Sequence, residues 1–597
     1  MFRRDFLILP LLAGAATAPA AAPASAGAAQ PAASDAANLL NTLFTQEWER
    51  ALREDPERAS GIGDTRYDDR WTDRSPAAIR ARQAGDRTAL ERLHAIDRTA
   101  LTADQQLNYD TFEWVLQRAV ERQRFREWLR PIDHKNGSQL ANDIAEVMSF
   151  HTSAGYRNYL SRMAALPARI EQEIALMKEG LAAGNTPPRV LMERVPSQIA
   201  KQIVDDPTRS PFFRPFQNPG EGIPASERAA FQSRAQATIR DALIPAFRKL
   251  QDYVRGEYLP RARTSVAASA LPEGAAYYAF LVRDQTTTDL SVDAIHEIGL
   301  KEVARLRQAI EALQAQIGFK GRLPEFFAHL RSDPKFFYKT PQELLNAYRA
   351  LAKRVDPELV RVFRIIPRQP YGVREIPAVA APDTTTAYYL PGAADSTRPG
   401  YYYVNLYKPE SRPIWEMMPL TLHEAVPGHH FQFARALELP EAPMFRKTAY
   451  FVAYGEGWGL YAEQLGYDMG LYDDPYDRVG QLIYEMWRAV RLVVDTGLHA
   501  KGWSREQAIA YFKDNTAKTE LDIVNEIDRY IGDPAQALAY KIGQIKISEL
   551  RARAQHSLGS NFDLRDYNDA VLAVGSVPLT TLEAHIGRWI EERRTRL

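Results

Sequence analysis

Three of the chain's 11 histidines fall within eight residues, where the sequence reads H-E-A-V-P-G-H-H from His423 to His430. Histidine and glutamate are residue types that bind and activate zinc. In the zinc motif H-E-x-x-H, two histidines four residues apart lie on one helix face, and the glutamate acts as general base. Here Pro427 occupies the place of the second histidine, and the next ones are His429 and His430. A metal site in this segment therefore requires an irregular backbone.

A regular helix cannot bring two of these histidines to one ion. A step of six residues turns His429 about 120° away from the face of His423, and a step of seven moves His430 about 10.5 Å along the axis. Zinc–nitrogen bonds are only about 2.0–2.1 Å long. Proline removes a helical hydrogen bond and glycine tolerates unusual dihedral angles. We therefore predict a distortion at Pro427 and Gly428 that returns His429 to the metal.

A third ligand must also come from histidine or a carboxylate, because the chain contains no cysteine. Catalytic zinc sites commonly use three protein ligands and leave a fourth position open. The segment A-Y-G-E-G-W-G-L-Y-A-E-Q-L-G offers Glu456 and Glu463, two turns apart on one helix face. Glu456 is the predicted ligand, because the glycines around it permit two helices to approach closely. Glu463 either orients a ligating histidine or is an exposed helix charge.

Apolar residues recur at spacings of three and four along most of the chain, which predicts a mainly α-helical fold. Short β-branched and aromatic runs between residues 361 and 407 predict a small antiparallel sheet. Pro419 suits the first turn of a helix that carries His423. Since 597 residues exceed the size of one core, we expect two lobes: a mainly helical N-terminal lobe at 27–355, and a catalytic lobe at 356–597 with the sheet and the metal-site helices.

Composition and the first residues indicate an exported protein. The 75 basic and 75 acidic residues give a formal net charge of zero, which offers no bulk attraction for nucleic acid or an anionic membrane. Residues 1–26 combine Arg3 and Arg4 with an apolar run and a small-residue end, which is typical of an export signal. The arrangement R-R-x-F-L resembles the twin-arginine type, and an ordinary secretory signal is the alternative. No later run is long enough to span a bilayer. We expect a soluble periplasmic protein after signal removal, in an oligomeric state that the sequence leaves open.

Several C-terminal motifs resemble those of known zinc hydrolases. E-G-W-G-L-Y-A-E resembles a segment of the thermolysin-like zinc aminopeptidases whose first glutamate completes a His, His, Glu site. Together with the histidine motif, D-T-G-L-H at 495–499 and R-Y-I-G-D-P-A-Q-A-L-A-Y-K-I-G at 529–543, it is similar to the bacterial family catalogued as domain of unknown function 885. The resemblance implies a mostly helical, zinc-peptidase-like fold with one metal ion at the floor of a cleft. It also favours His429 over His430 as a ligand, a choice that the residues alone leave open.

With one zinc ion on His423, His429 and Glu456, peptide hydrolysis is the expected reaction. Zinc lowers the pKa of a bound water toward about 7, so that hydroxide is available at neutral pH. Glu424 follows a ligand directly and has the position of the motif's general base. We expect it to take the proton of that water and to deliver it to the leaving amine.

The developing oxyanion needs a donor besides zinc. The candidates are Tyr530, Tyr540 and His499, and Arg529 could hold a substrate carboxylate in a bidentate pair. Each has a structural alternative. The tyrosines could belong to the core, the arginine to a structural ion pair, and the histidine to an ordinary helix contact with Asp495.

The predicted strand G-Y-Y-Y-V-N-L-Y is the nearest one to His423 in the sequence. An edge strand can align an extended peptide by adding it to the sheet. Tyr402 and Val404 are therefore predicted to bind substrate. The alternative is a structural strand with a tyrosine-rich face.

The preferred function is an exported zinc metallopeptidase acting on short peptides. Two other functions stay open. The site could hydrolyse another amide, such as a cell-wall cross-link, which the periplasmic destination motivates. The chain could also be a non-catalytic periplasmic peptide-binding protein with a degenerate site, which the irregular histidine spacing motivates.

Overall fold

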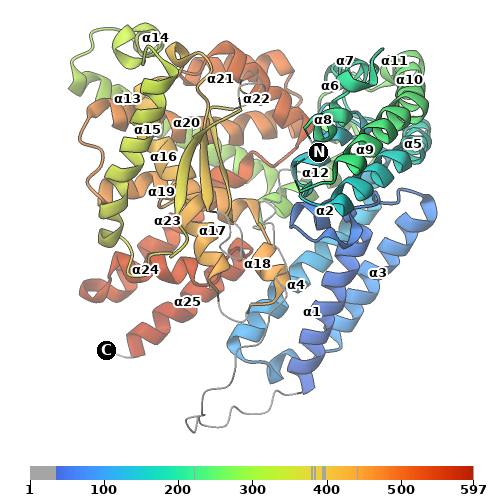
Figure 1. Cartoon of the computed structure of the whole chain (residues 1–597). Coiled ribbons are helices and arrows are strands. Elements are labelled where there is room, and N and C mark those ends of the chain that lie inside the picture. The colour runs from blue at the N-terminus through green and yellow to red at the C-terminus, as the bar shows by residue number, and fades with distance from the viewer. Residues whose placement is uncertain are drawn as a thin grey trace.

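The computed structural model describes residues 35–218, 220, 222–377, 381, 385–392, 399–439 and 442–595. Most of this part of the chain is helical, which confirms the predicted mainly α-helical fold (Figure 1). The predicted export signal at 1–26 lies outside the described residues.

The first eleven helices form two packed groups on the right of Figure 1. Helices α1, α3 and α4 share one core, with Leu43 and Phe112 among its members. Helices α5 to α11 bury a second core around Ile170 and Phe247. The bounds are α1 Asp35–Glu54, α2 Pro56–Gly61, α3 Pro76–His94, α4 Ala103–Arg122, α5 Ser153–Ala182, α6 Arg189–Met192, α7 Val195–Ala200, α8 Arg214–Gln217, α9 Ala225–Thr238, α10 Ile244–Tyr253 and α11 Leu259–Arg261.

Most of the remaining elements lie on the left of Figure 1, where α13, α16, α21 and α23 pack against α20. The apolar stripe of α13, which includes Val303 and Ile310, shares a core with Ile483 and Val490 of α20. This core therefore contains residues from both sides of the predicted lobe boundary after residue 355. The bounds are α12 Gly274–Thr286, α13 Val292–Ile317, α14 Leu323–Ser332, α15 Pro341–Val355, α16 Met417–Glu424, α17 His429–Leu437, α18 Met444–Thr448, α19 Val452–Asp468, α20 Pro475–Ala500, α21 Arg505–Asn515, α22 Glu520–Gly532, α23 Leu538–Leu558, α24 Leu564–Leu572 and α25 Leu579–Thr595.

The strands of the described residues form one small sheet of β1 (Tyr371–Glu375), β2 (Ala387–Leu390) and β3 (Gly400–Val404). The order is β1-β3-β2, with β1 parallel and β2 antiparallel to β3, so the sheet is mixed rather than antiparallel. Tyr402 and Val404 of β3 are completely buried. The prediction that this strand binds peptide as an edge strand is wrong, because both of its edges already pair with neighbours.

Candidate metal centre

The helix that carries His423 ends at Glu424, and a new helix begins at His429. Between them, Ala425 (φ −100°, ψ −108°) and Gly428 (φ −77°, ψ −128°) leave the helical region, and the Val426–Pro427 bond is cis. A Cβ atom on Gly428 would lie 1.9 Å from the carbonyl oxygen of His423, so only glycine fits. The predicted distortion at 427–428 is confirmed.

This irregular turn brings the three predicted ligands together. Nε2 of His423 lies 3.4 Å from Oε2 of Glu456, and Nε2 of His429 lies 3.5 Å from the same oxygen. One ligand atom from each residue falls within 4.8 Å of the others. Donor atoms placed about 2.1 Å from one tetrahedral ion are separated by about 3.4 Å. The spacing of the cluster therefore suits a single zinc-sized cation.

His430 points away from this cluster. Its Nε2 donates to the carbonyl oxygen of Gln369 (3.0 Å), which leaves Nδ1 to accept from the hydroxyl of Tyr389 (2.9 Å). Burial lowers the pKa of His430 to about 4, so the ring is neutral at physiological pH. Since both ring nitrogens of His430 are engaged, His429 rather than His430 joins His423 in the cluster that could hold a metal ion.

Glu463 orients His423 from the side opposite the metal position. Its Oε1 accepts from Nδ1 of His423 at 2.8 Å, and a guanidinium nitrogen of Arg488 lies 3.7 Å from the same oxygen. The Glu463 side chain is only 1% exposed, which excludes the alternative of an exposed helix charge. A carboxylate on the second nitrogen fixes the tautomer and makes the imidazole a better ligand.

Two glycines let α19 approach the neighbouring helices. A Cβ atom on Gly459 would lie 2.7 Å from Cε1 of His423, and one on Gly457 would lie 2.5 Å from the backbone of Gly543 in α23. The indole nitrogen of Trp458 donates to the carbonyl oxygen of Pro427 at 2.8 Å, which ties α19 to the irregular turn. The glycine-rich sequence of α19 thus positions Glu456, as predicted from its composition.

The cluster pairs an ionised carboxylate with a histidine whose pKa is raised, so a bound metal ion would displace a proton from His423. Burial alone would raise the pKa of Glu456, but the neighbouring His429 and His423 hold that pKa well below its ordinary value. Burial alone would lower the pKa of His423, whereas its hydrogen bonds to Glu456 and Glu463 raise it to about 9. The Glu456 carboxylate is therefore ionised at neutral pH, as a metal ligand must be.

Tyr450 is a member of the site that the sequence reasoning missed. Its hydroxyl donates to Oε1 of Glu456 at 3.1 Å, and its ring stacks on Phe433 of α17 at 5.7 Å. This bond leaves Oε2, the oxygen nearest both histidines, for the metal. The tyrosine lies just before the helix that carries Glu456, but nothing in its spacing indicates that it folds back onto that residue.

Glu424 is half-buried at the end of α16, directly next to His423. Burial is the main cause of the raised pKa of Tyr450 and of Tyr402, and the charge of Glu424 raises both pKa values further. Glu424 therefore borders the cluster without being one of its three ligands, which is compatible with a role as base.

The two predicted tyrosine donors differ in their surroundings. Burial and then the charge of Glu456 raise the pKa of Tyr540, so Tyr540 lies close to the third ligand. The guanidinium of Arg491 lies 4.3 Å from the Tyr540 ring. In contrast, the fully buried hydroxyl of Tyr530 donates to Glu526 at 2.7 Å and accepts from Nε of Arg491 at 2.8 Å. Tyr530 is a member of the core network.

His499 and Arg529 are engaged within the protein. Nδ1 of His499 accepts from the backbone nitrogen of Ala268, and Nε2 donates to the backbone oxygen of Tyr530, both at 3.0 Å. Arg529 donates to Gln536 at 2.6 Å and to Glu526 at 2.9 Å. His499 therefore supports the end of α22 and has no free ring nitrogen for substrate.

Comparison with known proteins gives a family but no activity. Residues 56–586 match the family described as "Bacterial protein of unknown function (DUF885)". A candidate lipoprotein from Colwellia psychrerythraea has a similar structure, with a TM-score of 0.87, 28% identity, and coverage of 94% of this chain and 100% of that chain. A candidate lipoprotein of unknown function from Shewanella oneidensis has a TM-score of 0.71 at 18% identity, covering 92% and 99%. The search of curated proteins gave no match.

Proposed function

Because the match spans most of its length, this chain belongs to the bacterial family DUF885, and we propose that it is an exported zinc-dependent metallopeptidase that hydrolyses peptide bonds in short peptides. The observation that carries the proposal is the convergence of His423, His429 and Glu456, whose ligand atoms all lie within 4.8 Å of one another, with Glu424 directly after His423 in the sequence. Two histidines and a glutamate form the donor set of thermolysin-type catalytic zinc sites.

In this proposal each residue has a separate task. Zinc at the cluster supplies a Lewis acid that acidifies water and polarises the scissile carbonyl. Glu424 accepts the proton of the attacking water and delivers it to the leaving amine. Tyr540, which lies near Glu456, is the best-placed of the three predicted donors for the oxyanion. Glu463 and Tyr450 hold His423 and Glu456 in position.

Export belongs to the same proposal. The paired arginines and apolar run at the start of the sequence support it, as does the likeness to a candidate lipoprotein. Among the described residues, no helix is both long and apolar enough to cross a bilayer. We expect the protein to act in the periplasm on peptides or peptide-like amides.

The test combines metal analysis with digestion of a peptide mixture. Wild-type protein is expected to carry one zinc ion per chain and to cleave peptides. Glu424→Gln should retain zinc and lose about 10²- to 10⁴-fold in turnover, because only proton transfer is removed. Glu438→Gln is a matched control, because the Glu438 carboxylate accepts from the backbone nitrogen of Arg368 at 2.7 Å and belongs to no proposed catalytic group. This substitution should leave activity unchanged. Full activity in Glu424→Gln, or cleavage of cell-wall fragments without any cleavage of linear peptides, would contradict the proposal.

A further inference from the structure

The two oxygens of the Glu456 carboxylate have different neighbours. Oε2 lies 3.4 Å from Nε2 of His423 and 3.5 Å from Nε2 of His429. Oε1 accepts a hydrogen bond from the hydroxyl of Tyr450 at 3.1 Å. An ionised carboxylate offers only acceptors, so the tyrosine is the donor. One oxygen of Glu456 therefore faces the histidines, while the other is engaged by the protein.

A carboxylate can bind a metal ion through one of its oxygens or through both. The difference is important at a catalytic site, because three protein ligands must leave a further position for water or substrate. A second oxygen from Glu456 would crowd that position. Since the protein's contribution to metal catalysis includes fixing the coordination number, the group that engages Oε1 decides whether the position stays open.

The ring of Tyr450 is held between α17 and α19. It stacks on Phe433 with 5.7 Å between the centroids and 10° between the ring planes, and the residue is 7% exposed. A Cβ atom on Gly455 would lie 2.6 Å from Cζ of Tyr450, so the ring occupies the space that this glycine leaves. Phe433 in turn lies 6.3 Å from the ring of His429, one turn earlier on α17. The helices that carry two of the ligands thus also position the hydroxyl.

The backbone after Tyr450 is anchored as well. The nitrogen of Phe451 donates to Oγ of Ser576 at 2.9 Å, and its ring packs edge-on against Trp114 at 5.2 Å. The carbonyl oxygen of Phe451 then accepts the first hydrogen bonds of α19. A donor whose ring and backbone are both fixed by packing holds its acceptor at a defined place.

We infer that Tyr450 is a positioning residue that restricts Glu456 to metal binding through Oε2 alone and so keeps a coordination position open. The bond that does this is charge-assisted, because its acceptor is ionised, and such bonds are stronger than neutral ones. The binding mode of Glu456 depends only on the candidate metal cluster. Its consequence for turnover rests on the proposed peptidase function.

The test compares the wild type with Tyr450→Phe, which removes the hydroxyl and keeps the ring against Phe433. Crystal structures of both zinc-loaded proteins should show one Glu456 oxygen at about 2.0–2.2 Å from the ion in the wild type and both oxygens bound in the variant. Cobalt-substituted protein gives the same information in solution, because visible absorption weakens as the coordination number rises. Gly455→Ala displaces the ring instead and should reproduce the change.

Azide probes the open position in the cobalt-substituted protein. It should bind about tenfold more weakly to Tyr450→Phe than to the wild type, because the second oxygen of Glu456 competes with it. For a short peptide, kcat should fall about 10- to 100-fold, with a smaller change in KM. A purely structural role of the hydroxyl would instead lower zinc affinity and leave the binding mode of Glu456 unchanged.

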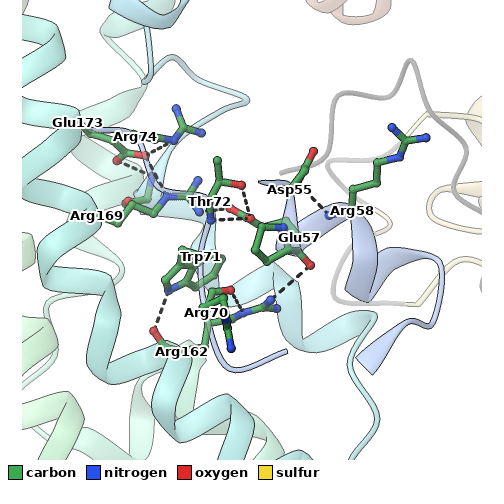
Figure 2. Close-up of polar contacts among 12 residues, drawn as sticks. Asp55, Glu57, Arg58, Arg70, Trp71, Thr72, Arg74, Arg162, Arg169 and Glu173 are labelled. Carbon is green, nitrogen blue, oxygen red and sulfur yellow. Dashed lines mark hydrogen bonds and ion pairs between the residues drawn. The ribbon is translucent and has the colours of Figure 1, made fainter. Parts of the chain in front are cut away.

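Thr72→Val is the matched control (Figure 2). The hydroxyl of Thr72 also donates to a carboxylate, that of Glu57 at 2.7 Å, in a network that joins α2 to α5 through Arg169. None of these residues belongs to the metal cluster. The control should leave the cobalt spectrum, the azide affinity and kcat unchanged, and equal thermal unfolding midpoints establish that the variants are folded.

Three results would overturn the inference: binding through both oxygens in the wild type, binding through Oε2 alone in Tyr450→Phe, or equal azide affinity in the two proteins. A change of binding mode in a protein that cleaves no peptide would uphold the role of Tyr450 and refute the peptidase. Peptide cleavage with the same binding mode in both proteins would overturn the role of Tyr450 alone.

Discussion

At the candidate metal centre, Nδ1 of His423 determines how the imidazole ring is oriented. Its bond to Glu463 directs Nε2 toward Glu456 and His429. Replacing Glu463 by alanine removes this restraint, so we expect zinc affinity to fall about 10- to 100-fold. Glu463→Gln keeps an oxygen that can accept from Nδ1 and should lose less. Competition with a zinc chelator measures both constants, and an unchanged affinity in Glu463→Ala would refute the orienting role.

The residues of the candidate metal cluster were predictable, because histidine and glutamate gathered so densely around residue 423 are typical of a metal site. Tyr450 was not predictable, since its bond to Glu456 depends on how the chain enters α19.

Among the elements, α19 acts as a platform whose glycines set the position of the ligands. In Gly459→Ala the new Cβ would lie 2.7 Å from the His423 ring, so the ring must move. We expect zinc affinity to fall at least about tenfold, since a displaced ligand loosens the site. Chelator competition again provides the measurement.

The control for this variant lies on the same helix. Gly466→Ala would place its Cβ 2.5 Å from the Tyr472 ring and 2.7 Å from Leu422, neither of which binds the metal. Overpacking of this kind costs about 1–3 kcal/mol of stability. Zinc affinity should nevertheless stay close to that of the wild type, and similar losses in the two variants would count against the platform role.

Helix α20 anchors the connection between α22 and α23 through Asp495, which accepts from the Tyr278 hydroxyl at 2.5 Å and from the backbone nitrogen of Ala535 at 3.0 Å. Burial raises the pKa of Asp495 from 3.8 to about 7, although both bonds act in the opposite direction. The folded state therefore binds a proton that the unfolded state releases above pH 4. Stability from this group is complete below about pH 4 and is lost as the pH rises to about 7.

Asp495→Asn removes this proton linkage while keeping an acceptor for Ala535 and Tyr278. The thermal unfolding midpoint of the wild type minus that of the variant should decrease as the pH rises from 4 to 7 and should then stay constant. The difference at pH 7 corresponds to roughly 1 kcal/mol or more. Midpoints measured in parallel across this range provide the test, and two profiles of the same shape would contradict the assignment.

The helices were predictable from their apolar periodicity, and the small sheet from its β-branched and aromatic runs. The strand order was not, because local sequence does not determine which strand lies in the middle. The prediction of β3 as an edge strand is wrong for this reason, since β3 pairs with both β1 and β2.

Across the whole molecule, the candidate metal centre depends on segments that lie far apart in the sequence. Glu456 of α19 meets His423 and His429, and Gly457 of the same helix packs against Gly543 of α23. Such relations depend on tertiary packing that the sequence does not encode locally.

The proposed function depends above all on one metal ion bound between His423, His429 and Glu456. The most direct measurement is a crystal structure of the zinc-loaded protein with an anomalous difference map at the zinc edge. We expect one peak per chain, about 2.0–2.2 Å from Nε2 of both histidines and from the Glu456 carboxylate, with His430 still bonded to Tyr389. A peak coordinated by His430, or no peak at this cluster under saturating zinc, would contradict this assignment.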